Sequence, residues 1–371
     1  MIRVPIGGSD FSTRPYTYND LPENDITLSN FSLANEDFQY KIPMIKACQE
    51  ASKKDIRLIG STWSPPTWTK TNDAITGFSR LKEEYYQYYA DYHLEFLKRY
   101  AENNINFWGI TTTNEPLNGV IPLVRFNSLG WSAKDMGDWI INNLGPTIRN
   151  SAFKDLKILT CDDQRYTIPV WFNLMVKEKP DVLNYINGVA VHWYGNKFTP
   201  ASTLSLVTNS HPDKFILATE ACSGASEITK VILGSWSRAE DYIKDICEDL
   251  NYNVVGWIDW NMCLNATGGP NWAKNYVDSP IIVFPEDGEF VKQPMFYAMG
   301  HFSKFIPNGS IRIDVTESKS LLKGSVQNVA FITPNKTYVA VVYNGGSERK
   351  VGISVGNKQA VIDMEKNSVA T

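Results

Sequence analysis

Residues 107–116 read Phe-Trp-Gly-Ile-Thr-Thr-Thr-Asn-Glu-Pro, an apolar and β-branched run that ends in polar residues and a proline. This composition favours a buried β-strand, and the strand must end before the proline, which cannot donate a ladder hydrogen bond. A second run of this kind, residues 214–222, reads Lys-Phe-Ile-Leu-Ala-Thr-Glu-Ala-Cys. The fold must therefore accommodate two buried strands that each end in a glutamate, Glu115 and Glu220.

Short β-rich runs of this type recur along most of the chain. We predict strands at Ile2–Gly7, Ile56–Ser64, Phe107–Glu115, Lys157–Asp163, Val189–Gly195, Lys214–Cys222 and Val254–Met262. Several are almost continuously apolar, as expected of parallel strands that are buried on both faces. Helical patterns lie between them, most clearly at Leu81–Asn103, Ala133–Asn143 and Arg238–Asn251. Alternation of strands and helices predicts a parallel sheet with crossover helices.

The pattern changes after Pro307. From Ser310 the chain reads SIRIDV, VAFIT, TYVAVVY and KVGISV, separated by Asn, Gly and Ser residues. Period-two alternation between turns predicts short antiparallel strands. We therefore predict an α/β fold: a (β/α)8 TIM barrel over residues 1–307, followed by a C-terminal antiparallel β-sandwich domain over residues 308–371.

The strand count bears on the barrel. A closed barrel of this type has eight parallel strands, whereas the sequence offers seven candidates and opens inside one of them, Ile2-Arg-Val-Pro. We expect an N-terminally truncated form that lacks the first barrel strand. The alternative is an open doubly wound sheet, which would gather its functional residues at one crevice. Polar residues at the ends of nearly all the predicted strands favour the barrel.

Composition excludes several classes of function. The net charge of −4 over 371 residues provides no basic excess for nucleic acid, so we predict no nucleic-acid partner. The five cysteines form no CxxC pair, and the four histidines form no HExxH motif, so neither a disulfide framework nor a metal site is predicted. The chain also has no phosphate-binding glycine loop of a standard type, and we predict no cofactor.

Four Asn-x-Ser/Thr triplets begin at Asn30, Asn265, Asn308 and Asn335. Such triplets are acceptors for N-glycosylation in the secretory pathway. Each alone arises often by chance. Together they favour a glycoprotein of that pathway.

The two strand-end glutamates carry the strongest chemical signal. In a barrel the C-terminal ends of all strands converge on one face, so Glu115 and Glu220 are expected to face each other. A pair of carboxyl groups is what glycoside hydrolysis requires, one to protonate the departing oxygen and one to attack the sugar. A lone glutamate more often caps a helix or pairs with lysine. The Asn-Glu-Pro context argues against that here, because Asn114 is placed to bind a sugar hydroxyl beside the acid.

Further motifs carry a family resemblance. They are Val191-His-Trp-Tyr194, Leu233-Gly-Ser-Trp236, Val254-Val-Gly-Trp-Ile-Asp-Trp-Asn261, Gly268-Gly-Pro-Asn-Trp272, Val277-Asp-Ser-Pro-Ile-Ile-Val283, Gln293-Pro-Met-Phe-Tyr297 and Gly300-His-Phe-Ser-Lys-Phe-Ile-Pro307. With these motifs the whole chain resembles the glucosylceramidases (acid β-glucosidases) of glycoside hydrolase family 30. The resemblance is to the ceramide-glucoside enzymes rather than to their xylanase relatives.

This resemblance implies a retaining β-glucosidase that hydrolyses glucosylceramide to glucose and ceramide in sphingolipid catabolism. At matching positions it implies Glu115 as the acid/base and Glu220 as the nucleophile. It further implies that Asp10 accepts hydrogen bonds from sugar hydroxyls and that His192 and Tyr194 orient the carboxylates. The remaining residues of the implied glucose subsite are Trp63, Asn114, Trp260 and Asn275.

The resemblance also implies binding partners and a cellular location. The expected partners are a saposin-type activator and an anionic lipid surface, and the expected location is the lysosome, peripheral at a membrane, or the secreted fraction. Two alternatives stay open at this point. One is a β-glycanase of the same clan that acts on polysaccharide, and the other is a non-catalytic sugar-binding relative.

Overall fold

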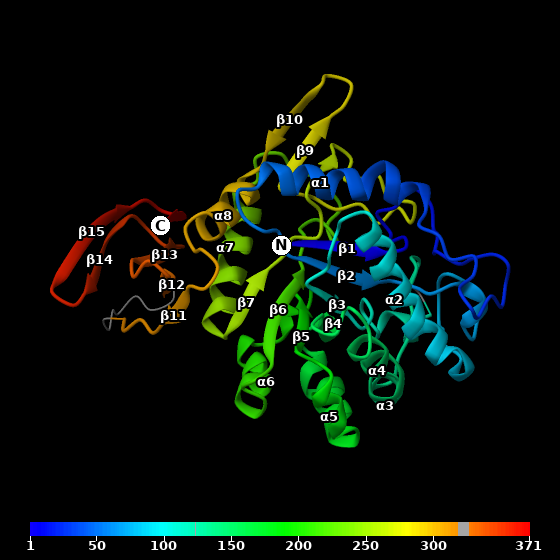
Figure 1. The fold of residues 1–371 in the computed structure, drawn as a ribbon. Coiled ribbons are helices and arrows are strands. Elements are labelled where there is room, and N and C mark those ends of the chain that lie inside the picture. The colour runs from blue at the N-terminus through cyan, green and yellow to red at the C-terminus, as the bar shows by residue number, and fades with distance from the viewer. Residues whose placement is uncertain (123, 318–325) are drawn as a thin grey trace. The chain divides into compact units, whose positions relative to one another are not determined.

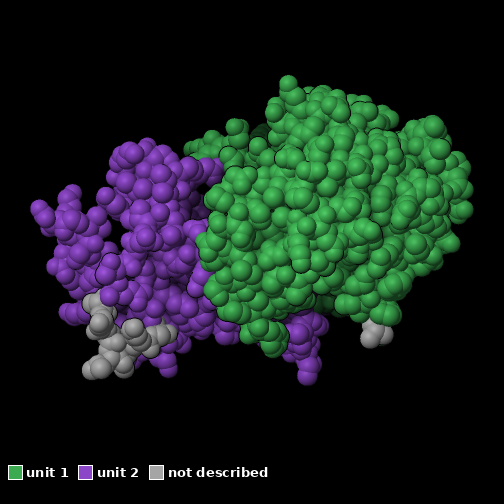
Figure 2. All heavy atoms as spheres, turned by 90° about the horizontal axis from the view of Figure 1, so that it is seen from below, with its two compact units in different colours: residues 1–221, 255–260, 269–276 green, residues 222–254, 261–268, 277–371 purple. Residues whose placement is uncertain are grey.

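The computed structural model describes residues 1–122, 124–317 and 326–371. It divides into two compact units, coloured separately in Figure 2. The first contains Met1–Ala221, Val255–Trp260 and Gly269–Tyr276, and the second contains Cys222–Val254, Asn261–Gly268 and Val277–Thr371. Each unit is described by itself.

A parallel sheet of seven strands forms the centre of the first unit (Figure 1). The strands are β1 (Ile2–Ile6), β2 (Leu58–Thr62), β3 (Gly109–Thr111), β4 (Lys157–Gln164), β5 (Gly188–His192), β6 (Phe215–Glu220) and β7 (Val254–Trp257). They are ordered as in the sequence, from β1 to β7, and pair in parallel from β1 through β6. All seven predicted strands are thus confirmed.

Burial explains why these segments form strands. Every residue of β2, β3 and β5 is buried, so an apolar side chain is stable on either face of the sheet. Residues from several strands meet in one apolar cluster that consists of Ile59, Leu159, Ala190, Leu217 and Ile258. The helices of this unit are α1 (Ile42–Ala51), α2 (Tyr86–Glu102), α3 (Ala133–Trp139), α4 (Gly145–Arg149), α5 (Asn173–Glu178) and α6 (Ser205–Ser210).

Several predicted elements are shorter than expected, including the strand Val254–Met262, which ends at Trp257, and the helix Leu81–Asn103, which begins at Tyr86. Two further differences have a visible cause or form. The predicted strand Phe107–Glu115 ends at Thr111, because the chain then turns across its neighbours: Asn114 N donates to Thr62 O of β2 and Glu115 N donates to Asp162 O of β4, at 2.8 and 2.9 Å. The predicted helix Ala133–Asn143 is interrupted after Trp139 by one wider helical turn, and α4 follows it.

In its described residues, the second unit contains two helices, one small sheet with both parallel and antiparallel pairing, and further antiparallel strands. The helices are α7 (Trp236–Asn251) and α8 (Pro294–Ser303), and one small sheet consists of β8 (Leu264–Asn265), β9 (Ile281–Phe284) and β10 (Glu289–Lys292). A four-stranded sheet consists of β11 (Ile311–Ile313), β12 (Val326–Ile332), β13 (Tyr338–Asn344) and β16 (Ser368–Ala370), and a hairpin consists of β14 (Arg349–Val355) and β15 (Lys358–Met364). The predicted antiparallel strands are confirmed. In the described ranges, no helix has the length and apolar character needed to cross a membrane.

The buried cluster predicts a stability effect. Leu159 has no accessible surface, so Leu159→Ala should lower the free energy of unfolding by about 2–5 kcal/mol through lost contacts and a cavity. The control is Leu206→Ala on α6, which removes a side chain that is 41% exposed and should cost less than about 1 kcal/mol. Urea unfolding followed by tryptophan fluorescence measures both, and equal losses would contradict this account of the core.

Candidate active site

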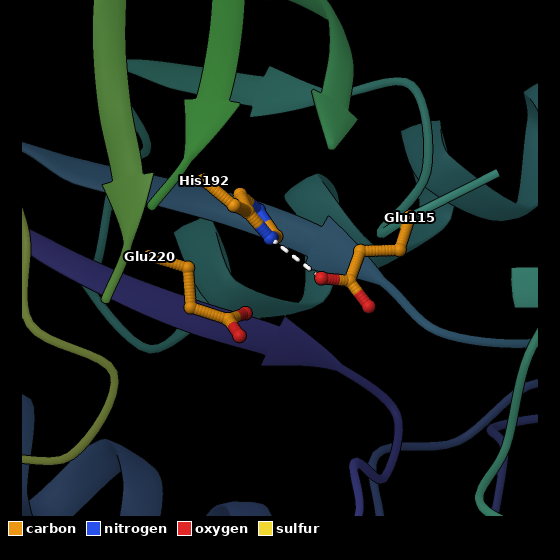
Figure 3. A group of neighbouring side chains, drawn as sticks. All are labelled: Glu115, His192 and Glu220. Carbon is orange, nitrogen blue, oxygen red and sulfur yellow. Dashed lines mark hydrogen bonds and ion pairs between the residues drawn. The ribbon is translucent and has the colours of Figure 1, made fainter. Parts of the chain in front are cut away.

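Glu115 and Glu220 lie together in the first unit, although 105 positions separate them in the sequence. Glu220 ends β6, and Glu115 follows the short strand β3. One oxygen of each carboxyl group and one ring nitrogen of His192 all lie within 4.8 Å of one another. Figure 3 shows both carboxyl groups pointing into the same space. The prediction that the two glutamates face each other is therefore confirmed.

Three side chains hold the carboxyl group of Glu115. Its Oε1 lies 2.9 Å from His192 Nδ1 and accepts a hydrogen bond of 2.9 Å from Gln164 Nε2, while Asn118 Nδ2 donates to Oε2. Gln164 is itself fixed, because its Oε1 accepts from Gly195 N at 3.0 Å. The backbone of Glu115 has a φ of 42°, a left-handed conformation that is costly outside glycine. The side chain is therefore held in one orientation by both its backbone and its partners.

Glu220 has a different set of partners. Arg3 Nη1, from β1, donates to its Oε2 at 2.5 Å, and Tyr194 OH donates to its Oε1 at 2.9 Å. The Arg3 side chain is only 2% exposed, so this ion pair is shielded from solvent. Both oxygens of Glu220 thus accept hydrogen bonds that favour the ionised carboxylate.

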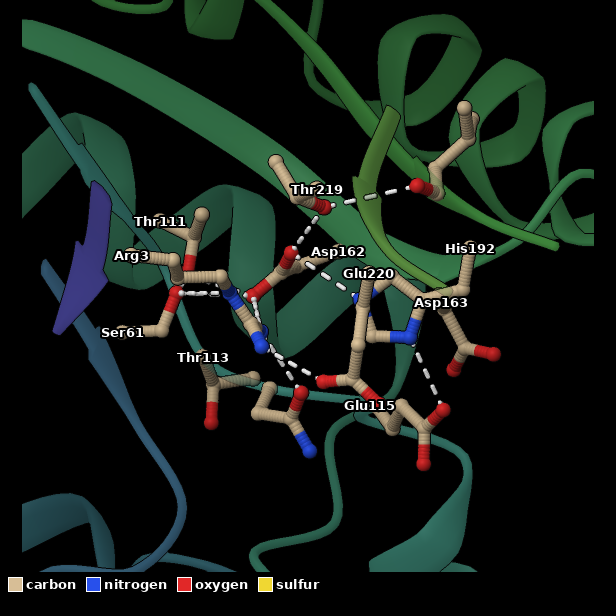
Figure 4. A network of polar contacts seen from close by, with 12 residues as sticks. Arg3, Ser61, Thr111, Thr113, Glu115, Asp162, Asp163, His192, Thr219 and Glu220 are labelled. Carbon is tan, nitrogen blue, oxygen red and sulfur yellow. Dashed lines mark hydrogen bonds and ion pairs between the residues drawn. The ribbon is translucent and has the colours of Figure 1, made fainter. Parts of the chain in front are cut away.

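The Asp162 carboxylate lies at the centre of the network in Figure 4. Its side chain has no accessible surface. One residue from each of five other strands contacts it at 2.6–3.1 Å: Arg3 of β1, Ser61 of β2, Thr111 of β3, His192 of β5 and Thr219 of β6. Arg3 and His192 therefore each bridge Asp162 to one of the two glutamates.

This arrangement determines the charge of the bridging groups. Burial alone would lower the pKa of His192, but Glu220 and the hydrogen-bonded Asp162 and Glu115 raise it to about 10, so the ring is an imidazolium that donates from both nitrogens. Burial would raise the pKa of Asp162, but the Arg3 guanidinium and His192 hold it well below its ordinary value. The pKa of Arg3 is raised despite its burial, because Asp162 and Glu220 favour its charge.

The other buried carboxyl groups are shifted upward. Burial raises the pKa of Glu220 above its ordinary value, although His192 and Arg3 lower it in part. Burial raises the pKa of Asp10 to about 7, with a further contribution from Glu220 that the Asn275 amide opposes. Burial and the nearby Glu115 raise the pKa of Asp163 to about 7. Negative charge is therefore limited around the two glutamates.

The remaining predicted residues lie in the same unit. Asp10 Oδ2 accepts from Asn275 Nδ2 at 3.0 Å and from Asn271 Nδ2 at 3.2 Å. The rings of Trp63 and Trp260 stack with centroids 4.9 Å apart, and the Arg3 guanidinium lies 4.7 Å from the Trp63 ring centroid. Arg3 Nη2 also donates to Asn114 Oδ1 at 2.7 Å. Contacts through Arg3 thus connect Asn114 and the tryptophan pair to Glu220.

Sequence reasoning missed five residues of this arrangement: Arg3, Asn118, Asp162 as the network's centre, Gln164 and Asn271. The signal for Arg3 was a charged residue inside the apolar run Ile2–Gly7, since a buried charge requires a partner. Asp162 and Gln164 lie in the polar end of the strand β4, after its apolar residues, in the way that Glu115 comes after the apolar residues of β3. Asn118 begins a single 3-10 turn and Asn271 lies in a loop, and the sequence offers no comparable signal for either residue.

Glu115, His192 and Glu220 are also the kind of residues that can bind a metal ion. Their contacts do not fit that role. Both ring nitrogens of His192 face carboxylates, which leaves no lone pair for a metal, and Arg3 and Tyr194 already donate to Glu220. The prediction of no metal site is thus compatible with the donor set.

Sequence comparison identifies the family. Residues 1–306 match the glycosyl hydrolase family 30 TIM-barrel domain, and residues 309–371 match the glycosyl hydrolase family 30 β-sandwich domain. The chain belongs to glycosyl hydrolase family 30. The predicted fold class and the family resemblance are confirmed.

Two individual relatives and one solved structure are similar to this chain over most of its length. The chain is 43% identical over 355 residues to the lysosomal acid glucosylceramidase of Mus musculus, covering 94% of this chain and 68% of the relative. It is 45% identical over 314 residues to the Caenorhabditis elegans protein named "Putative glucosylceramidase 3", covering 84% of this chain and 60% of the relative. The family 30 chain thus spans about three fifths to two thirds of these relatives' length. Among solved structures, SrfJ from Salmonella typhimurium superposes with a TM-score of 0.89 at 26% identity, covering 99% of this chain and 79% of SrfJ.

The Asp162 network predicts a pH-dependent loss of stability. Asp162→Ala leaves Arg3 and His192 buried without their shared anion and should cost about 3–5 kcal/mol. Because folding lowers the pKa of Asp162, its contribution to the free energy of unfolding is present above its unfolded pKa of about 4 and is lost as the pH falls further. The raised pKa of His192 means that its contribution is complete below about pH 6.5 and is lost as the pH rises toward 10.

The difference in unfolding free energy between wild type and Asp162→Ala should therefore be largest near pH 5–6. Urea unfolding from pH 3 to pH 9 measures it. The exposed Asp181 provides the control, since Asp181→Ala should change stability by less than about 0.5 kcal/mol at every pH. A difference that keeps growing toward pH 9 would contradict the assigned charges.

Proposed function

We propose that this chain is the catalytic portion of a retaining β-glucosidase that hydrolyses glucosylceramide to glucose and ceramide. The observation that supports it most is the separation of the two glutamates, whose nearest carboxyl oxygens lie within 4.8 Å. Retaining glycosidases hold their carboxyl groups at about 5–5.5 Å, whereas inverting enzymes need about 6.5–9.5 Å to admit a water molecule. Facing oxygens within 4.8 Å of each other leave little room for a water molecule between the two carboxyl groups, which favours direct attack by one carboxylate.

The partners of each glutamate suggest which role it has. Arg3 and Tyr194 donate to Glu220 and favour the carboxylate form that a nucleophile requires. In the first step, a Glu220 oxygen attacks the anomeric carbon while Glu115 gives its proton to the departing oxygen. The bond from carbon to the leaving oxygen breaks, ceramide departs as the alcohol, and a glucosyl ester of Glu220 remains.

In the second step the proton moves in the opposite direction. The Glu115 carboxylate accepts a proton from water as the water oxygen attacks the anomeric carbon. The ester bond to Glu220 breaks, and glucose leaves with its original configuration. Asp10, held by Asn271 and Asn275, would accept hydrogen bonds from sugar hydroxyls, and the stacked Trp63 and Trp260 would border the sugar.

The proposal also names a lipid-linked substrate. It rests on the motifs shared with the glucosylceramidases and on the names of the mouse and nematode relatives. The same likeness supports a role in sphingolipid catabolism, a lysosomal or secreted glycoprotein, a saposin-type activator and an anionic lipid surface. Hydrolysis of glucosylceramide in anionic vesicles, compared with xylan and β-glucan, tests the substrate class. Preference for a polysaccharide would favour a β-glycanase, and binding without turnover of any substrate would favour a sugar-binding relative.

The proposed roles predict that substitution of each glutamate affects a different step of catalysis. Glu220→Gln should abolish the covalent intermediate, whereas Glu115→Gln should lose about 10²–10⁴-fold on poor leaving groups and retain turnover of a dinitrophenyl β-glucoside, which needs no protonation. Glu178→Gln, an exposed site on α5, is the control and should keep wild-type activity. Mass spectrometry after treatment with a cyclitol epoxide should find the label on Glu220. Label on Glu115 instead would reverse the assigned roles.

The hydrogen bond from Tyr194 to Glu220 predicts how the pH profile of kcat/KM depends on this tyrosine. Glu220 must be ionised to attack, so kcat/KM should fall as the pH drops through its pKa, which burial holds above the ordinary glutamate value. The Tyr194 hydroxyl stabilises the ionised form and lowers that pKa. Tyr194→Phe should therefore move the acid limb of the profile upward by roughly 0.5–1 unit. The exposed Tyr40 supplies the control Tyr40→Phe, and an acid limb that moves downward would refute the assignment.

A further inference from the structure

A second buried charged cluster surrounds the end of β1, apart from the two glutamates. At its centre is Asp37, whose side chain has no accessible surface. Tyr18 OH and Tyr100 OH each donate to Asp37 Oδ1 at 2.7 Å, and Lys41 Nζ lies 3.3 Å from the same oxygen. The described activity uses none of these four residues, although Asp37 and the two tyrosine hydroxyls are buried polar groups that the fold had to satisfy, and the Lys41 side chain is only 18% exposed.

Lys41 also contacts the main chain of β1 and the residues that follow. Its ammonium group donates to Pro5 O at 2.8 Å and to Gly7 O at 2.7 Å. Hydrogen bonds from a charged donor are roughly twice as strong as neutral ones. Gly7 has a φ of 80°, so the chain leaves the strand direction between these two contacts. Lys41 thus fixes the point at which β1 turns into the loop that contains Asp10.

The fixed segment connects two residues of the site. Arg3, which binds Glu220, precedes Pro5 by two positions, and Asp10 follows Gly7 by three. Beyond Lys41 the loop is held by neutral contacts, from Gly8 N to Tyr16 O at 3.0 Å and from Asn127 Nδ2 to Gly8 O at 2.5 Å. Lys41 therefore supplies the charged contact to a segment that must place Asp10.

We propose that Lys41, held by Asp37, is a positioning residue for sugar binding, and that it acts by fixing the main chain between Pro5 and Gly7 and so the position of Asp10. The inference rests on the proposed sugar-binding role of Asp10. We call the two hydrogen bonds from Lys41 to Pro5 O and Gly7 O the clamp. Asp37 keeps the ammonium group of this clamp in its charged form. Burial would lower the pKa of Lys41, but Asp37 and Tyr16 raise it above its ordinary value, so the ammonium keeps its proton at acidic and neutral pH.

Removal of the charged clamp should affect substrate binding more than the chemical step. Lys41→Met leaves two carbonyl groups without their donor, while Asp37 keeps both tyrosine hydroxyls. KM for a chromogenic β-glucoside should rise roughly tenfold with a smaller change in kcat, and Lys41→Arg should recover most of the loss. Tyr100→Phe is the matched control, since it removes a hydrogen bond to the same Asp37 oxygen but leaves the contacts of Lys41 with Pro5 O and Gly7 O in place. It should lower the melting temperature and leave KM near the wild-type value.

A double-mutant cycle separates positioning from stability. If Lys41 acts through Asp10, then Lys41→Met should add little to the KM of Asp10→Asn, because coupled residues are not additive. Independent effects of the two substitutions, or an equal rise in KM for Tyr100→Phe, would overturn the proposal.

Hydrogen exchange of the peptide that covers residues 7–16 gives a readout without substrate. Exchange should be faster in Lys41→Met than in wild type or Tyr100→Phe, and unchanged exchange would overturn the clamp. A wild-type chain that cleaves no β-glucoside would instead refute the proposed function, and the exchange measurement would still decide whether Lys41 orders the loop.

Discussion

A single buried carboxylate holds the inner face of the parallel sheet together. Asp162, on β4, contacts one residue from each of β1, β2, β3, β5 and β6. Two of these contacts are from cations, Arg3 and His192, and each cation extends to one glutamate. A carboxylate in this position would be costly to bury alone, but two charged donors and three hydroxyl donors supply hydrogen bonds to both of its oxygens. The positions of the two glutamate side chains therefore depend on Asp162, through its contacts with Arg3 and His192.

The same cations make the two glutamates chemically different. Glu220 contacts a permanently charged guanidinium and a phenol, whereas Glu115 contacts an imidazolium and two amides. The charges of this cluster also balance in one particular state. Arg3 and His192 offset Asp162 and Glu220 when Glu115 is in its acid form. That state is the one in which the first step of a double displacement begins, with a nucleophile ionised and an acid protonated.

The sequence predicted the elements better than the contacts between them. The seven strands were predictable because each is a local apolar run, and Glu115 and Glu220 stood out because each breaks such a run at its end. Asn114 was indicated by its place beside Glu115 in the Asn-Glu-Pro run. The family resemblance gave the other site residues, and the functional roles of all of them stay predictions: Asp10, Trp63, His192, Tyr194, Trp260 and Asn275. Arg3 could have been recognised as a buried charge, but its hydrogen-bond partners come from four other segments and no local pattern identifies them. The early end of β3 was unpredictable for the same reason, since hydrogen bonds donated by Asn114 N and Glu115 N to the carbonyl oxygens of Thr62 and Asp162 on neighbouring strands turn the chain away.

The two cations beside the glutamates have a consequence for ligands that carry a positive charge. A protonated amine in place of the reacting carbon would bring a third cation close to Arg3 and His192. Glu220 can attract such a ligand, but its carboxylate already accepts hydrogen bonds from Arg3 and Tyr194. Repulsion from the guanidinium would therefore offset part of that attraction. A neutral sugar of the same shape would meet no such repulsion, so the site would distinguish two ligands of equal shape by their charge.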